Sequence, residues 1–209
     1  MKRFSVEIEI WLVAFVVCAA VAAFCFVEID VWVAHRLWSV GRHLSPLSTA
    51  FGATVILALE AVIAVGLIVA RLMRGHISRF GEALGLACLA SICAYGVNDQ
   101  VLKPFFGVQD PVAVIRGAKH TFHLASNLAM GTFPSGHMVL AGAFAGVFMR
   151  FYRASVGLLS GLLLLAAVLL VVGDWHFVSD VIMGAFLGVS GGILAAEAWA
   201  VHMVGSRYG

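Results

Sequence analysis

The segment from Ser155 to Gly173 contains no charged residue, and it is one of several long apolar runs in the chain. A helix that crosses a bilayer needs about 20 mostly apolar residues. Hydrophobic residues make up 62% of the 209 residues and charged residues only 11%, whereas soluble domains carry about 25% charged residues. So few charges would not cover the surface of a soluble protein. We therefore expect lipid to surround most of this chain.

Six segments are long and apolar enough to cross a membrane, which predicts an all-α fold: a bundle of six transmembrane helices in a single domain over residues 1–209. The limits of the second and fourth segments are the least sharp, because the second contains Glu60 and the fourth begins at a polar motif. The predicted spans are approximately 9–28, 49–70, 82–102, 136–152, 155–173 and 177–200.

Lysine and arginine residues indicate the orientation, because cytoplasmic loops of membrane proteins carry an excess of both. With the N-terminus in the cytoplasm, eight of these residues fall on that side and five on the other. This predicts a multi-pass protein of a bacterial inner membrane with both termini inside. The eight are Lys2, Arg3, Arg71, Arg74, Arg79, Arg150, Arg153 and Arg207; the five are Arg36, Arg42, Lys103, Arg116 and Lys119.

Three connections then emerge on the outer face, towards the periplasm or exterior. Residues 29–48 form an amphipathic stretch that is expected to lie along the membrane interface. Residues 103–135 form the longest connection and residues 173–176 the shortest, and their polar residues are expected to meet on this face. The net charge of +2, without a run of basic residues, gives no indication of a nucleic-acid partner.

The first motif, Phe133-Pro134-Ser135-Gly136-His137, directly precedes the fourth predicted helix. A serine between proline and glycine at a helix start exposes successive backbone N–H groups at the positive end of the helix dipole, which suits phosphate oxygens. His137, one turn from that site, has the chemistry to donate a proton to a leaving group. The alternative interpretation is an ordinary helix cap beside an interfacial histidine.

The second motif opens the sixth predicted helix with His176 and Asp180, which are four residues apart and so share one helix face. A carboxylate bonded to one imidazole nitrogen selects the tautomer and leaves the other nitrogen as nucleophile or base. The alternative is a pair that only satisfies two polar groups at the interface. Because ionisable residues at membrane depth mark functional sites, and a second histidine lies on the same face, we favour the catalytic interpretation.

With Lys103, these motifs resemble the three-part signature of the type 2 phosphatidic acid phosphatase superfamily: Lys-x6-Arg-Pro, Pro-Ser-Gly-His and Ser-Arg-x5-His-x3-Asp. The resemblance covers the second half of the chain, with active-site segments at residues 103–137 and 173–180. It implies a metal-independent lipid phosphatase that needs no cofactor. A metal is not expected from the residues either, because His120 and His123 alone make a poor ligand set.

The resemblance also implies a role for each motif residue. His176 would attack phosphorus and become a phosphohistidine, Asp180 would orient it, and His137 would protonate the leaving oxygen. The phosphoryl oxygens would be held as charge redistributes in the reaction. The residues implied for this binding are Lys103 and, through their backbone N–H groups, Ser135 and Gly136.

The sequence departs from this signature at both arginines, which would each clamp phosphate with two hydrogen bonds. Asp110 occupies the position of the first, and Leu169-Leu170 the positions of the Ser-Arg pair. We expect basic residues of the long connection to replace the lost charge. A substrate that needs fewer clamps and a degenerate site that binds lipid without turnover are the alternatives. The candidate replacements are Arg116, Lys119, His120 and His123.

The sequence thus predicts an enzyme that hydrolyses a lipid phosphate or pyrophosphate at the headgroup plane, such as an isoprenoid diphosphate, a phosphatidate or a lipid A phosphate. A lipid phosphotransferase and a non-catalytic lipid-binding or transport protein are the alternatives. Asp99 is expected to pair with Lys103, four residues later. Glu60 is expected to be a buried acid or a proton relay, and Asp174 to lie at the headgroup level.

Overall fold

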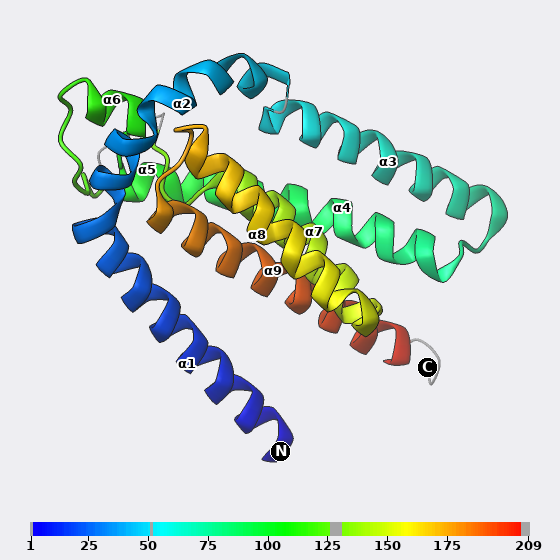
Figure 1. Cartoon of the computed structure of the whole chain (residues 1–209). Helices are drawn as coiled ribbons and strands as arrows, with labels where there is room; N and C mark the ends of the chain where they lie inside the picture. Colours follow the sequence, from blue (N-terminus) through cyan, green and yellow to red (C-terminus); the bar gives the residue numbers. More distant parts are fainter. Residues whose placement is uncertain (1, 51, 126–130, 206–209) are drawn as a thin grey trace.

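The computed structural model describes residues 2–50, 52–125 and 131–205. Within these ranges the chain is entirely helical, as predicted, without a β-strand (Figure 1). The long helices are α1 (Lys2–Phe24), α2 (Asp30–Ala50), α3 (Ala53–Arg74), α4 (Arg79–Val97), α7 (Gly136–Phe151), α8 (Val156–Val172) and α9 (Val178–Gly205). The short elements are η1 (Cys25–Ile29), η2 (Asn98–Leu102), α5 (Lys103–Phe106), α6 (Pro111–Ile115) and η3 (Arg153–Ser155).

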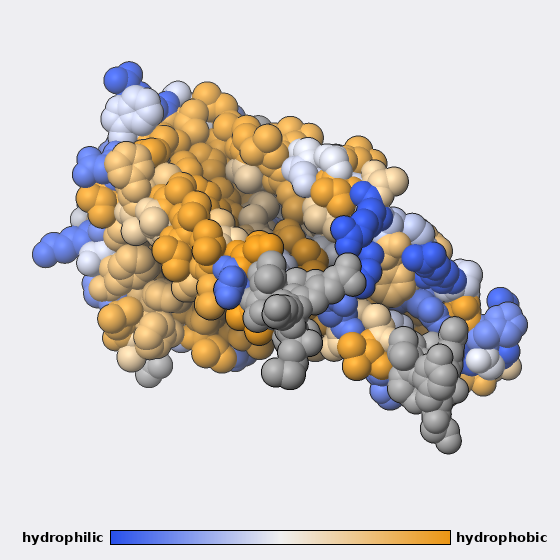
Figure 2. Space-filling view, turned by 90° about the horizontal axis from the view of Figure 1, so that it is seen from below, coloured by the Kyte–Doolittle hydropathy of each residue, from blue (hydrophilic) through white to orange (hydrophobic). Residues whose placement is uncertain are grey.

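Among the described residues, five helical segments are long and apolar enough to cross a membrane. α7 is apolar too, but its 16 residues span only about 24 Å, which is less than the ~30 Å of a hydrocarbon core. Hydrophobic residues cover most of the face seen in Figure 2. These features fit an integral membrane protein. The five segments are Ile8–Gly41, Ala53–Arg74, Arg79–Ile115, Arg153–Val172 and Val178–His202.

The first helix does not end near residue 28, where the first predicted span stops. α1 passes through the π-helical turn η1 into α2 without an interruption, because no proline or glycine lies between Phe24 and Asp30 to end the helix. A π-turn adds one residue to the turn and redirects the axis. In Figure 1, α2 lies across the end of the bundle that also carries α6. The predicted amphipathic stretch is therefore a helix, and its first residue, Asp30, is buried.

α3 and α4 form a hairpin whose ends follow from local sequence. α3 ends at Gly75, which has a left-handed φ of 73°, a conformation that glycine adopts without steric cost. α4 begins after Ser78, whose hydroxyl accepts a hydrogen bond from the N–H of Gly81 at 3.1 Å. The hairpin turn lies at the opposite end of the molecule from α6 (Figure 1).

α7 and α9 approach each other closely along their lengths, and glycine makes this possible. A Cβ atom on Gly142 would lie 2.9 Å from the backbone nitrogen of Val189. On the other helix, a Cβ atom on Gly192 would overlap the carbonyl oxygen of Ala143. Small residues at membrane helix interfaces let two backbones come together in this way. The α7–α9 pair is thus the centre of the bundle, with the motif residues at one end of it.

Buried polar side chains concentrate at that end. All but two of the buried polar residues belong to the loops or helix ends beside α6 and the α8–α9 turn, while Glu60 and Ser91 lie apart from them on α3 and α4. Buried polar groups need partners, so these side chains are expected to contact one another, and this end of the bundle is the candidate location of an active site. The residues gathered there are Asp30, Asn98, Thr132, Ser135, Asp174, His176, Ser179 and Asp180.

Changing Gly192 to alanine tests the close approach of α7 and α9. The added methyl group overlaps the backbone of Ala143, and overpacking of this kind costs about 1–3 kcal/mol, so we expect a lower midpoint of thermal unfolding in detergent. The control is Gly161→Ala on α8, where nothing lies within 4 Å of the new Cβ. Equal midpoints for the two variants would contradict this description of the interface.

Candidate active site

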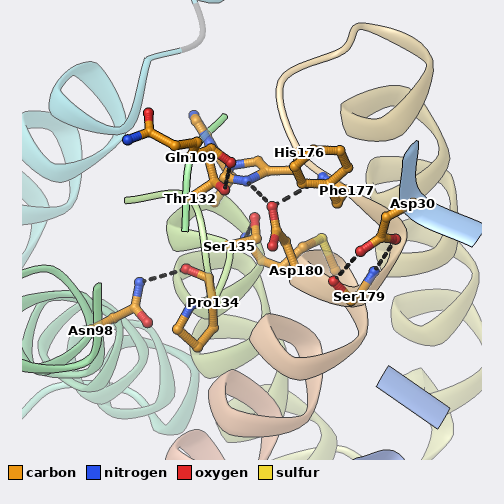
Figure 3. Close-up of polar contacts among 12 residues, drawn as sticks. Asp30, Asn98, Gln109, Thr132, Pro134, Ser135, His176, Phe177, Ser179 and Asp180 are labelled. Carbon is orange, nitrogen blue, oxygen red and sulfur yellow. Dashed lines mark hydrogen bonds and ion pairs between the residues drawn. The ribbon is translucent and has the colours of Figure 1, made fainter. Parts of the chain in front are cut away.

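Segments that lie far apart in the sequence meet at the polar end of the bundle (Figure 3). The backbone N–H of Ser135 donates a hydrogen bond to the carbonyl oxygen of Asp180 at 3.1 Å, which joins the start of α7 to the start of α9. The side-chain amide of Asn98 donates to the carbonyl oxygen of Pro134 at 3.1 Å, which joins η2 to the same segment. The two predicted motifs are therefore brought together by backbone hydrogen bonding.

His176 lies in the turn just before α9 and Asp180 in the first turn of that helix, and their side chains contact each other at the predicted four-residue spacing. Nδ1 of His176 is 3.4 Å from Oδ2 of Asp180. The same carboxylate oxygen accepts a hydrogen bond from the backbone N–H of Phe177 at 3.0 Å. Asp180 is fully buried and His176 is 7% exposed. A carboxylate held in this way keeps Nδ1 of the imidazole protonated and leaves Nε2 with its lone pair.

His137 lies on the side of His176 that faces away from Asp180. Its Nδ1 atom is 3.4 Å from Nε2 of His176, and the two ring centroids are 5.7 Å apart. The three side chains thus form a row in which a carboxylate contacts a histidine and that histidine contacts a second one. Such a row places a proton donor or acceptor at the nitrogen that is free to react.

Ser135 has a different task from the one that the sequence predicted. Its N–H, which was expected to bind phosphate, is directed to the carbonyl oxygen of Asp180. Its hydroxyl caps α7 by accepting from the N–H of Met138 at 3.4 Å, and the residue is fully buried. The N–H group of Gly136 comes next, in the first turn of α7, where a helix has no intrahelical acceptor to offer.

Lys103 extends towards this helix start. A Cβ atom on Gly136 would lie 3.3 Å from its Nζ atom and 2.9 Å from the ring of Tyr95. The ammonium group pairs with Asp99 at 3.1 Å, so the predicted salt bridge is confirmed. Only glycine leaves room at position 136 for the lysine to come this close to the backbone. A positive charge and the N-terminal end of α7 therefore share one small region.

The positions of the missing arginines have ordinary structural roles. Asp110 caps α6 by accepting a hydrogen bond from the N–H of Ala113 at 2.7 Å. Leu170 is buried in an apolar cluster with Met138 and Val181, and Leu169 is exposed on α8. Neither position presents a charge to the histidines.

The loop residues that were predicted to replace these arginines lie at different places. Arg116 follows α6 and is exposed, as is Lys119. His123 is exposed and its Nδ1 lies 3.2 Å from the carbonyl oxygen of Gly107. His120 is the one with a nearly buried side chain, 6% exposed. The structure therefore brings His120 into the protein and leaves the other three on the surface of the long connection.

A family model of the PAP2 superfamily matches residues 83–203, which is more than half of the chain. The chain belongs to the PAP2 superfamily. The resemblance inferred from the motifs is thereby confirmed, and membership supports a phosphatase-type activity. The searches of curated proteins and of solved structures each found no match.

The first half of this PAP2 protein supplies a residue that sequence reasoning did not single out. Asp30, 1% exposed at the start of α2, accepts hydrogen bonds from both the N–H (3.1 Å) and the hydroxyl of Ser179, next to Asp180. An acid inside the apolar run Cys25–Trp32 was a signal for it, because such residues are rare in membrane segments. Asp30 ties α2 to the beginning of α9 and so supports the position of His176.

His120 lies against the same carboxylate. Its Nε2 atom is 3.8 Å from Oδ2 of Asp30. The ring stacks on Phe26 with centroids 4.1 Å apart and lies beside Phe177 at 4.3 Å. Burial lowers the pKa of the imidazole below its ordinary value, and the nearby charge of Asp180 opposes that shift. His120 therefore fastens the long connection to α2 and the α9 motif.

Asp174, which was predicted to lie at the headgroup level, is buried within the protein. It is 3% exposed, and neither carboxylate oxygen has a hydrogen-bond partner among the described residues. It packs against Gly41 of α2, where a Cβ atom would overlap the carboxylate. Burial raises the pKa of this carboxyl group to about 6. The α8–α9 turn thus places Asp174, a buried acid that is unfavourable to ionise, against α2 two residues before His176.

Asp174→Asn should stabilise the fold at pH 8 and have little effect below pH 4. A carboxyl group with a raised pKa in the folded state favours folding only while protonated, and this contribution disappears as the pH rises from about 4 through about 6. The gain at pH 8 is at most about 3 kcal/mol. Asparagine also tolerates the left-handed φ of 54° at this position.

Thermal unfolding in detergent at both pH values measures this difference, and the low-pH measurement serves as the internal control. An equal shift at both values would mean that the variant acts through packing and not through the charge of Asp174.

Proposed function

We propose that this PAP2 protein hydrolyses a lipid phosphate or pyrophosphate through a phosphohistidine at His176. The observation that supports this proposal most is the row formed by Asp180, His176 and His137, with both contacts at 3.4 Å. A histidine whose Nδ1 is held by a carboxylate has a nucleophilic Nε2. The second histidine beside that nitrogen is placed to exchange a proton with a leaving group.

The reaction proceeds in two displacements at phosphorus. In the first, Nε2 of His176 forms a bond to phosphorus while the bond from phosphorus to the lipid oxygen breaks, and that oxygen takes a proton from His137. In the second, a water oxygen attacks phosphorus, the nitrogen–phosphorus bond breaks, and His137 takes the proton of the water. Free phosphate leaves, and both histidines return to their starting forms.

The two histidines must separate when the substrate binds. A phosphorus atom ready for attack lies ~3–3.5 Å from its nucleophile, and the leaving oxygen lies beyond the phosphorus, between it and His137. The two nitrogens are 3.4 Å apart in the free protein, which leaves no room for both atoms. The phosphoryl group therefore displaces the contact between His137 and His176, and the ring of His137 moves outward.

The phosphoryl oxygens are held by the region between Lys103 and the start of α7. The lysine ammonium group, the N–H group of Gly136 and the positive end of the helix dipole all favour an anion there. Support for this assignment is the short separation of Lys103 from the Gly136 backbone. The loop residues Arg116 and Lys119 add positive charge, and His123 a hydrogen-bonding group, from the surface of the long connection.

The same proposal places the protein in the membrane with six crossing helices, counting α7 at the centre of the bundle. The polar end then lies at the outer headgroup plane, facing the periplasm or exterior, and both termini lie in the cytoplasm. The basic residues of the α3–α4 turn and of the α7–α8 turn support this orientation, because both turns lie at the end away from the histidines (Figure 1).

Purified protein in detergent micelles should release inorganic phosphate from at least one member of a panel of lipid phosphates and pyrophosphates. His176→Ala abolishes release, and His137→Ala lowers the rate by about 10²–10⁴-fold, the usual contribution of a general acid or base. Lys103→Met weakens binding of phosphate. The control is His76→Ala, because His76 is exposed in the α3–α4 turn.

A rapid acid-free quench with a ³²P-labelled substrate should trap label on the wild-type protein and none on His176→Ala. Phosphate release that survives in His176→Ala would overturn the proposed nucleophile. Transfer of the label to a second lipid without free phosphate would identify a phosphotransferase instead, and no turnover of any lipid would indicate a binding or transport protein.

A further inference from the structure

A groove on the side of the bundle leads away from His137 towards the middle of the membrane-spanning helices. It has a volume of about 650 Å³ and is lined by residues of α3 (55–63), α7 (137–145) and α8 (159–166). These helices run alongside one another in Figure 1, and α3 and α8 each contact α7. Its volume falls in the range of ~300–1,000 Å³ that is typical of small-molecule sites.

The groove begins at the proposed proton donor. From His137 to Ala145 the wall of α7 extends about 12 Å, eight residues at 1.5 Å each. A molecule that lies along this wall with its phosphate at the histidines therefore has its remaining atoms in the groove. Because nearly all of the lining side chains are hydrocarbon, the part that lies there is a hydrocarbon chain.

Two polar side chains interrupt this apolar wall, His137 at one end and Glu60 on α3. Glu60 is 7% exposed, and its Oε2 atom has no hydrogen-bond partner among the described residues. An unpaired carboxyl oxygen among apolar side chains is costly to bury, and an acid at membrane depth is a sign of function. The sequence predicted either a buried acid or a proton relay at this position.

The depth of Glu60 follows from its neighbours. Its carboxyl group interacts with Ser91 of α4, and the Ser91 hydroxyl donates to the carbonyl oxygen of Leu140 at 3.1 Å. Leu140 lies three residues after His137, which is about 4.5 Å along the axis of α7. The carboxyl group is thus roughly one helical turn further into the bundle than the proposed proton donor.

We propose that the groove binds the hydrocarbon chain of the substrate and that Glu60 hydrogen-bonds an oxygen in the linkage between that chain and the phosphate. The lipid group that would form this hydrogen bond with Glu60 is an ester carbonyl or a hydroxyl a few bonds from phosphorus, as in acylglycerol phosphates. A polyprenyl phosphate has no such oxygen. A neutral carboxyl group carries the O–H donor that an ester carbonyl needs. The inference rests on the proposed function, and it makes Glu60 a residue that determines which lipid phosphate the protein prefers as substrate.

The experiment compares dioleoyl phosphatidate with farnesyl phosphate, each in dodecyl maltoside micelles, for wild type, Glu60→Leu and Glu60→Gln. We expect Glu60→Leu to lower kcat/KM for phosphatidate by roughly two- to ten-fold, the effect of one lost neutral hydrogen bond, and to leave farnesyl phosphate unchanged or faster. Glu60→Gln keeps a donor at this position and should retain most of the activity on phosphatidate.

The outcomes separate the two proposals. If wild type hydrolyses neither these two lipids nor any other member of the panel and forms no phosphohistidine, the proposed function fails and the role of Glu60 fails with it. If wild type acts on other members of the panel but on neither of these two, the function stands and the inference about Glu60 is overturned. If wild type is active but Glu60→Leu changes both substrates equally, or neither, the function stands and the inference about Glu60 is overturned. Wild-type activity on farnesyl phosphate alone overturns it as well.

Filling the groove with a larger side chain tests, independently of Glu60, whether the hydrocarbon chain of the substrate lies there. Ala141 lies on the α7 wall, so Ala141→Phe should reduce turnover of dioleoyl phosphatidate several-fold while sparing dihexanoyl phosphatidate, whose chains are short. The matched control is Ala20→Phe, at an exposed position on α1. Equal loss for both chain lengths, in a variant that unfolds at the wild-type temperature, would contradict a hydrocarbon chain in this groove.

Discussion

The close approach of α7 and α9 is the constraint on which the site depends. Glycines on both helices remove the side chains that would hold the backbones apart. Gly184 extends this contact to the motif, because a Cβ atom there would lie 2.6 Å from the carbonyl oxygen of Ser135. Only at this separation can the N–H of Ser135 reach the carbonyl oxygen of Asp180, and that bond sets the two histidines side by side.

Periodicity and motif spacing predicted the helices and the contact between His176 and Asp180, because both depend on residues that are close in the sequence. The i,i+4 geometry of His176 and Asp180 is an example. Long-range contacts were beyond such reasoning. No local pattern links Asp30 to Ser179, 149 residues away, or Asp174 to Gly41. The continuation of α1 into α2 was missed as well, because the amphipathic residues 29–48 suggested a separate interfacial segment, whereas the backbone contains no helix breaker there.

The site holds its nucleophile more firmly than it holds an anion. Buried hydrogen bonds of Asp180, Asp30 and Ser179 hold the segment that carries His176. In contrast, Asp110, at the position of one missing arginine, caps a short helix, and Leu170, at the position of the other, lies in a hydrophobic cluster. A pre-organised nucleophile lowers the barrier whatever the charge of the substrate. In the proposed reaction, with Lys103 as the cation beside the helix start, the apolar part of a lipid substrate would contribute a larger share of the binding free energy than in a site with two arginine clamps.

The bond between Asp30 and Ser179 has a consequence for how the protein is made. Asp30 is synthesised early, but its partner enters the membrane only with the last helix. Until then the carboxylate has to remain near the aqueous boundary, since an unpartnered acid is disfavoured in lipid. The nascent chain therefore forms the Asp30–Ser179 contact between α2 and α9 only after α9 has been inserted.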